Sequence, residues 1–316
     1  MSRIEISKER FHRVENWIKR NARPLEAAQW QWMFKGGSRD LIISYLSAFQ
    51  NEDGGFGHGL EPDFWLPDSS PMATWTAGQL LIEVEASPEE EIVQGLVSYL
   101  TDTCQEDWGM WPSVLPENNQ FPHAPWWHWR EGVQENWMFN PSIELAAFLI
   151  HWTPERSKSS LLGWKSIERA IPRLMECKEM DSHEINNYQH FVQLIQPFEA
   201  SFNSNLPYTL KEVSNKILIL AEQSMEKQVS SWSVGYKALP LDFIHGPDHP
   251  LCGKMNELIQ SNLNFYIAKL PETGVWDISW KWGEYENEFA VARRYWQGIL
   301  AIKRFKKLEL FGCLQK

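Results

Sequence analysis

The stretch Gln50–Gly57 reads QNEDGGFG and ends an apolar run with acidic residues, glycines and an aromatic side chain. The same order ends two other apolar runs, in Gln105–Trp111 and in Pro271–Trp276. The aromatic residues of the first two stretches are 55 positions apart, and that of the third follows after 165 positions, three times the same spacing. A repeat of this length accommodates two helices and their loops, and such units bury a core only by stacking on their neighbours.

Helical periodicity dominates the segments between these turns. Residues 41–49 and 92–100 each place their apolar side chains on one helical stripe, and Glu286–Lys307 is the last long helix that the sequence predicts. No run alternates with a period of two over more than a few residues, so the sequence predicts no sheet. The expected fold class is therefore all-α.

Two further helices carry start signals. Pro71–Val84 follows Asp68–Ser70, a run of good N-cap residues, and its proline falls near the first turn. Ser142–Trp152 follows Asn140-Pro141 in the same way. Its apolar residues cover every side of the helix, so we expect it to be buried all round.

The alternation of fully buried helices with amphipathic ones predicts two concentric layers. We therefore expect a single α/α toroid domain over residues 1–316, with an inner and an outer ring built from about five to six helical hairpins. Two long segments, 54–70 and 112–139, interrupt the helices. Loops of that length inside a compact domain are usually functional or disordered, and their aromatic content argues against disorder.

Composition narrows the class of protein and its partners. The chain has 316 residues, 43% of them hydrophobic and 22% charged, which is typical of a globular protein. Its formal net charge of −11 argues against a nucleic-acid partner. Four scattered cysteines, no apolar leader and no stretch approaching a membrane span favour a cytoplasmic protein with reduced thiols. The 18 tryptophans either fill gaps between stacked helices or line an aromatic cavity.

The turn Gln50–Gly57 resembles the repeat of the terpenoid cyclase and protein prenyltransferase superfamily, whose members are α/α toroids. Trp111 and Trp276 stand where that superfamily places its aromatic residue. A closer resemblance is to uncharacterised bacterial prenyltransferase-like proteins, and it covers the segments 53–63, 67–69, 123–127 and 139–141. The resemblance implies a toroid with an aromatic-lined central cavity, and the closer relatives imply no known reaction.

The chain departs from the superfamily in each of its three chemistries. It has neither the Asp-x-Asp-Asp motif of class II cyclases nor the Asp-Asp-x-x-Asp motif of class I synthases. The zinc-binding Asp and Cys of the prenyltransferase β subunit correspond most nearly to Asp277 and Ser279, with serine in place of cysteine. The resemblance therefore implies a fold without implying a function. We expect neither a bound metal nor a cofactor.

The first candidate cluster lies on the loop that precedes Pro71. It contains His58, Glu61, Asp63 and Asp68 within eleven residues. Crowded carboxylates raise one another's pKa, which suits a general acid at neutral pH. The structural alternative is that Asp68 caps the following helix and that Asp63 forms a turn after proline.

The second candidate cluster is the segment 123–129, where His123 lies between prolines and precedes Trp126 and Trp127. Tryptophan faces bind cations and stack on sugar rings alike. We interpret this loop as cavity lining, with His123 as an acid/base candidate. Anchoring of the loop in the core is the alternative.

The third candidate cluster is the segment 276–282. Side chains alternate between the two faces of an extended segment. Trp276 and Trp280 stand an even number of positions apart, so they are expected to project one way and Asp277 the other. Arg294 and its neighbour Arg293, on the following helix, are available to pair with these acids or to hold an anionic group of a substrate. A structural turn pinned by its aromatic residue is the competing interpretation.

These clusters lead to one preferred function and two alternatives. The preferred function is an enzyme that acts on an apolar small molecule, with isoprenoids as the leading class, by acid/base chemistry at one end of the ring. The alternatives are a carbohydrate-active enzyme of the (α/α)6 type and a non-catalytic binding or scaffold toroid. The sequence leaves the oligomeric state open. The residues expected at the site are Glu61, Asp63, His123 and Asp277 as catalytic groups, with His58, Asp68, Trp126, Trp127, Trp276, Trp280 and Arg294 as substrate-binding groups.

Overall fold

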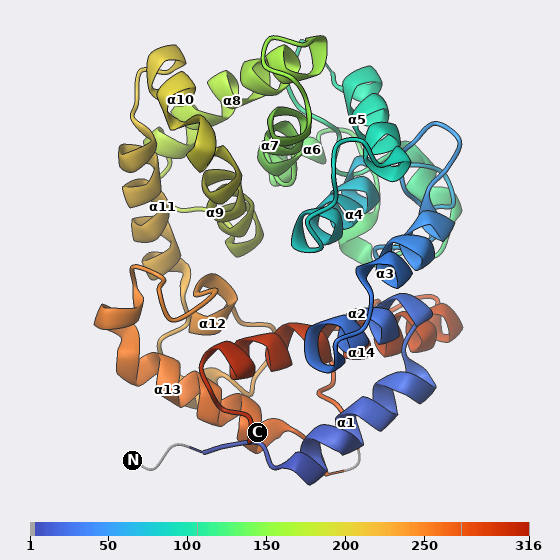
Figure 1. The fold of residues 1–316 in the computed structure, drawn as a ribbon. Coiled ribbons are helices and arrows are strands. Elements are labelled where there is room, and N and C mark those ends of the chain that lie inside the picture. The colour runs from blue at the N-terminus through green and yellow to red at the C-terminus, as the bar shows by residue number, and fades with distance from the viewer. Residues whose placement is uncertain (1–3, 106, 273, 316) are drawn as a thin grey trace. The chain divides into compact units, whose positions relative to one another are not determined.

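The computed structural model describes residues 4–105, 107–272 and 274–315, and these residues form an all-α fold (Figure 1). Glu106 and Thr273, which belong to two of the repeated turns, lie outside the described residues. Within the described ranges the only β contacts are isolated bridges. The predicted all-α class is therefore confirmed, whereas the toroidal arrangement of the helices stays a prediction.

The chain divides into two compact units. The first joins Met1–Tyr45 to Met225–Lys316, and the second is the continuous segment Leu46–Ser224. The single domain that the sequence suggests stays a prediction. None of the described helices is long and apolar enough to cross a membrane.

The first unit is formed by helices from both ends of the chain. Helix α14 packs against α1 and α2, and the Arg10 guanidinium of α1 donates hydrogen bonds to the carbonyls of Ile267 and Leu270, at 3.1 and 2.7 Å. Residues near the two ends also meet, because the Ile6 N–H donates to the Cys313 carbonyl at 2.8 Å. The helices are α1 (Lys8–Asn21), α2 (Pro24–Lys35), α3 (Arg39–Leu46), α12 (Pro240–Phe243), α13 (Cys252–Lys269) and α14 (Glu286–Leu310).

The second unit is arranged around α7, which packs against α4, α5, α8 and α9 (Figure 1). As the sequence predicts, the segment from Ser142 to Ile150 is buried on every side. The approach of α8 is so close that a Cβ atom on Gly163 would lie 2.7 Å from the Ala146 carbonyl oxygen. The helices are α4 (Pro71–Glu83), α5 (Glu91–Thr103), α6 (Gln134–Trp137), α7 (Ser142–Trp152), α8 (Lys158–Glu176), α9 (Ser182–Ile195), α10 (Glu199–Asn205) and α11 (Leu210–Ser224).

The first repeated turn ties α4 to α5. The Gln50 side-chain amide donates to the carbonyls of Gly54 and Ile92, at 2.9 and 3.0 Å. Gly54 has a positive φ of 86°, and a Cβ atom there would lie 2.2 Å from the Gly95 carbonyl oxygen of α5, so only glycine fits. The Phe56 N–H donates to Thr74 Oγ1 of α4 at 3.0 Å.

The second and third repeated turns make related bonds. The Trp111 N–H donates to Ser142 Oγ of α7 at 3.0 Å, as Phe56 does to α4. The indole N–H of Trp111 donates to the carbonyl of Leu100, and that of Trp276 donates to the carbonyl of Tyr266, at 2.9 and 2.8 Å. In both cases the acceptor lies near the end of the preceding helix. The recurring aromatic residue thus fastens each turn to neighbouring helices.

The start signals of two helices need correction. Ser70, and not Asp68, caps α4, because its hydroxyl accepts the N–H of Ala73 at 3.1 Å. Helix α7 has Pro141 at its N-cap position and no side-chain cap bond. Both helices nevertheless begin where the sequence predicts, since proline at or beside the first position restricts the backbone to the helical φ.

Candidate functional site

The two long loops of the second unit pair with each other. Phe64 and His123 form an isolated antiparallel bridge. The Trp65 N–H donates to the Pro122 carbonyl at 2.9 Å, and the Ala124 N–H donates to the Asp63 carbonyl at 2.8 Å. These chain-distant loops therefore lie together at Asp63 and His123, whereas the shared pocket that the sequence predicts for Glu61, Asp63 and His123 stays a prediction.

The two carboxylates on the first loop are buried. Glu61 is 7% exposed and Asp63 is 3% exposed. Glu61 Oε1 accepts the N–H of Asp63 at 3.2 Å, which closes a tight local turn. Carboxylates are rarely buried in soluble proteins unless they are paired, so these groups differ from ordinary solvated turn residues.

The second loop contributes a pair of histidines. His123 Nδ1 lies 2.6 Å from the Phe121 carbonyl oxygen and must donate to it, because a carbonyl only accepts. His123 Nε2 then faces His128 Nδ1 at 3.1 Å, and the two rings stack with centroids 5.3 Å apart. His128 is exposed whereas His123 is buried. The pair therefore connects solvent to the buried side of the loop cluster, the two paired loops 54–70 and 112–139.

The two expected tryptophans of this loop differ in their environment. Trp127 is buried and stacks on Trp137 with centroids 4.5 Å apart, and its ring lies 5.1 Å from that of Phe64. Its indole nitrogen has no hydrogen-bond partner among the described residues. Trp126 is 38% exposed. Trp127 therefore anchors the loop, and Trp126 is the ring that remains accessible to a ligand.

His58 and Asp68 lie at the surface and not among the buried acids. His58 is exposed and its Nε2 lies 2.9 Å from Asn51 Oδ1. Asp68 is also exposed. Neither a capping role nor burial accounts for Asp68, and its expected contact with a substrate stays a prediction.

The first unit contains the four remaining expected residues, Asp277, Trp276, Trp280 and Arg294. Asp277 accepts hydrogen bonds from Arg293 and from the Gln297 amide, and the Arg293 hydrogen bonds hold the pKa of Asp277 below its ordinary value. A carboxyl that is ionised in this way is a poor general acid. Its position relative to the loop cluster of the second unit stays a prediction. Arg294 lies 3.4 Å from Asn21 Oδ1.

The tryptophans of the 276–282 segment alternate as expected. Trp276 and Trp282 are each 2% exposed, whereas Asp277 is exposed. The Arg304 guanidinium lies over the Trp276 ring, 5.1 Å from its centroid. This contact gives Trp276 a structural role. Trp280 is half-buried and its ring lies 5.3 Å from that of Trp296.

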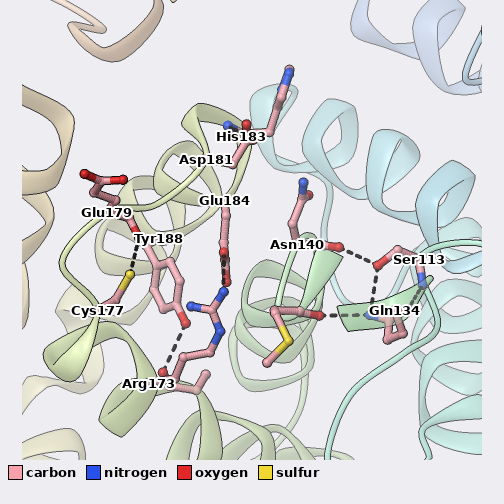
Figure 2. A network of polar contacts seen from close by, with 12 residues as sticks. Ser113, Gln134, Asn140, Arg173, Cys177, Glu179, Asp181, His183, Glu184 and Tyr188 are labelled. Carbon is pink, nitrogen blue, oxygen red and sulfur yellow. Dashed lines mark hydrogen bonds and ion pairs between the residues drawn. The ribbon is translucent and has the colours of Figure 1, made fainter. Parts of the chain in front are cut away.

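Polar contacts join the two ends of the second loop to each other, just before the start of α7 (Figure 2). Ser113 Oγ donates to the Asn140 carbonyl at 2.5 Å. Gln134 accepts the Ser113 N–H at 2.8 Å and donates to the Met138 carbonyl at 2.9 Å. These bonds therefore hold both ends of the loop, which restricts the positions that His123 can take.

In the second unit, sequence reasoning missed two buried glutamates. Glu144 of α7 is 2% exposed and accepts hydrogen bonds from α4 and α9. Glu184 of α9 pairs with Arg173 at 3.0 Å (Figure 2), and burial raises its pKa to about 7 despite that partner. For Glu144 a signal was present, since it is the one acidic residue in an otherwise apolar helix.

The described residues contain no group of three or more His, Cys, Asp or Glu side chains placed to hold a metal ion. The comparisons with protein-family models, with curated proteins and with solved structures find no match.

Proposed function

We propose that the protein is an enzyme that acts on an apolar small molecule, with isoprenoids as the leading class, by acid/base chemistry. The observation that supports this proposal is the backbone pairing of the two long loops, with Glu61 and Asp63 buried on the first loop and His123 buried on the second. Carboxylates and an imidazole in a water-poor environment are the groups that donate and accept protons at neutral pH.

The histidine pair supplies a route for the proton. His128 exchanges protons with solvent and contacts His123 Nε2 at 3.1 Å. The two ring nitrogens of His123 face the Phe121 carbonyl and His128, so His123 holds the neighbouring imidazole in position. In this proposal His128 transfers the proton to the substrate from Nε2 and takes up another from solvent.

The aromatic rings around the loops favour an apolar or cationic substrate group. Trp127 stacks on Trp137 and packs at a tilt against Phe64, and Trp126 on the same loop is exposed. Ring faces stabilise positive charge, such as that which develops when an alkene is protonated.

A carbohydrate-active enzyme is the second candidate, and one observation favours it. The half-buried Trp75 lies beside a polar group formed by Gln79, Glu144 and Asn187. A tryptophan face beside amide and carboxylate groups is the arrangement that binds a sugar ring and its hydroxyls.

Calorimetric titration with farnesol, farnesyl diphosphate and a set of linear oligosaccharides tests both candidates. The proposal expects an isoprenoid to bind the wild-type protein, and Asp63→Asn or His123→Gln to weaken that binding at least about tenfold, with a small change in the midpoint of thermal unfolding. Glu117→Gln, an exposed substitution on the same loop, serves as the control.

Binding of an oligosaccharide without any binding of an isoprenoid would replace the first candidate with the second. Isoprenoid binding that is unchanged in both Asp63→Asn and His123→Gln would show that the loop cluster is not the site. If neither class binds, the proposed substrate classes are wrong.

A further inference from the structure

A single buried carboxylate joins three helices in the second unit. Glu144 of α7 accepts the indole N–H of Trp75 at 2.7 Å and the amide of Asn187 at 3.0 Å, both at Oε2. The Gln79 amide donates to Oε1 at 3.1 Å. Trp75 and Gln79 belong to α4, and Asn187 belongs to α9. Three neutral donors thus fix the orientation of this carboxylate.

The fourth partner of Glu144 is an imidazole that reaches solvent. His190 Nδ1 lies 3.3 Å from Oε1 and 3.4 Å from Oε2 of Glu144, and its side chain is 32% exposed. The Gln79 amide nitrogen lies 3.1 Å from the same Nδ1, so two tautomers fit the geometry: Nδ1 accepts from Gln79, or Nδ1 donates to the carboxylate. The catalytic arrangement is the tautomer in which Nδ1 donates to Glu144. With Nδ1 committed to Glu144, a proton exchanged with a ligand passes through Nε2. A carboxylate that fixes the tautomer of a solvent-facing histidine is the arrangement used for general base catalysis.

The electrostatics keep the carboxylate charged. Burial by itself would raise the pKa of Glu144, but the charge and hydrogen bond of His190, with the bonds from Trp75 and Asn187, outweigh it and hold the pKa below its ordinary value. Glu144 is therefore ionised at neutral pH, and its charge stabilises the imidazolium that forms when His190 takes up a proton.

A purely structural cross-link explains this network less well. Asn187 is 1% exposed, and its Oδ1 has no hydrogen-bond partner among the described residues, although its amide group bonds to Glu144. A buried acceptor without a partner carries a free-energy cost and needs an explanation, of which a catalytic role is one. Three neutral donors would already hold the helices together without a charged pair.

We propose that His190 is a catalytic base on the face formed by α4, α7 and α9, with Glu144 as its positioning residue and Trp75 as the adjacent wall. The ligand is a small molecule that gives up a proton to imidazole while its ring or planar face lies against Trp75. This inference rests on the proposed function only in taking the protein to be an enzyme, because it assigns the proton transfer to residues outside the two loops.

The probe is 5-nitrobenzisoxazole, a planar compound that a single base converts without a cofactor. Nε2 of His190 takes the proton from C3, the C–H electron pair completes the nitrile, and the N–O bond breaks to give 2-cyano-4-nitrophenolate, which is followed by absorbance. The imidazolium then returns its proton to water. The wild-type protein should catalyse this elimination, and His190→Gln should lower the rate by roughly tenfold to a hundredfold. His151→Gln, on an exposed histidine of α7, should leave it unchanged.

Glu144→Gln separates positioning from structure. It should lower kcat for the elimination with little change in KM, because a neutral amide no longer orients the imidazole for proton transfer. A purely structural role would lower stability and leave kcat of the folded protein unchanged. His123→Gln distinguishes the two proposals, since a rate that depends on His123 and not on His190 would overturn this inference and leave the proposed function standing.

Equal rates for the wild type and His190→Gln would overturn the inference. If His190→Gln does not fold, the unmutated protein is carbethoxylated with diethyl pyrocarbonate, and the modified histidines are identified by mass spectrometry. Loss of the elimination rate should then follow modification of His190 and recover with hydroxylamine. Loss that follows another histidine contradicts the proposal.

Discussion

At the scale of single residues, Glu184 couples the stability of the second unit to pH. Its carboxyl is 4% exposed, and only Oε2 is paired, with Arg173 at 3.0 Å (Figure 2). Oε1 is buried and has no hydrogen-bond partner among the described residues. Burial therefore outweighs the attraction of Arg173 and raises the pKa of Glu184 from 4.5 to about 7. The folded protein binds this proton more tightly than the unfolded chain.

We predict that Glu184→Gln flattens the pH dependence of unfolding. Because the wild-type protein loses a proton on unfolding between pH 4.5 and about 7, its free energy of unfolding falls as the pH rises through this range. The fall is on the order of 3 kcal/mol. Urea unfolding at pH 4.5 and at pH 8 should show this fall in the wild type and in Glu179→Gln, an exposed control. Equal falls in the wild type and Glu184→Gln would contradict the assignment.

At the scale of elements, the contact between α7 and α8 depends on one glycine. A Cβ atom on Gly163 would lie 2.7 Å from the Ala146 carbonyl oxygen, and backbone atoms move only if the helices separate. The close approach lets Ile150 and the other apolar residues of α7 pack directly on α8.

We predict that Gly163→Ala destabilises the protein by roughly 1–3 kcal/mol, because overpacking outweighs the gain in helix propensity. The matched control is Gly253→Ala in α13, where an added Cβ atom meets nothing within 4 Å. That control should leave stability unchanged or raise it by up to about 1 kcal/mol. Chemical denaturation of both variants measures the difference. A neutral or stabilising effect of Gly163→Ala would mean that the two helices can move apart freely.

The sequence predicts elements better than it predicts their polar partners. Helix α7 begins and ends where its proline and its apolar run indicate, because both signals are local. The cap of α4 was assigned too early in the chain, since Asp68, Ser69 and Ser70 are all good N-cap residues and only the path of the loop selects Ser70.

The candidate site was predicted in part for a similar reason. The acidic and aromatic composition of the loops around Asp63 and His123 marks them as candidates in the sequence, and the structure pairs these loops. Glu144 and His190 lie on separate helices 46 positions apart, so their contact depends on tertiary packing. A single acidic residue in a buried helix signals that a partner exists without identifying it.

At the scale of the whole molecule, the two units differ in how they use the chain. The second unit is one continuous segment with its own buried core around α7. The first needs segments from both ends of the chain, which are joined by contacts such as that of Arg10 with the carbonyls of Ile267 and Leu270.

We predict that the fragment 46–224 folds alone, whereas the fragment 225–316 does not. The first retains every helix that packs on α7, and the second lacks α1 and α2, against which α14 packs. Far-UV circular dichroism with urea unfolding should show a cooperative transition only for the fragment 46–224. Loss of cooperativity in that fragment would mean that the second unit depends on the first for its stability. Cooperative unfolding of both fragments would contradict the expected role of α1 and α2.

The bond between the Ile6 N–H and the Cys313 carbonyl bears on the order of events during protein synthesis. A ribosome that adds about 5–20 residues per second needs roughly 15–50 s to travel from the end of the first segment to the last residues. During that interval the ribosome synthesises the segment 46–224 before it reaches α14, the helix that packs on α1 and α2. The faces of α1 and α2 that contact α14 are uncovered until then. The emerging N-terminal helices are therefore the part of the nascent chain that we expect chaperones to hold.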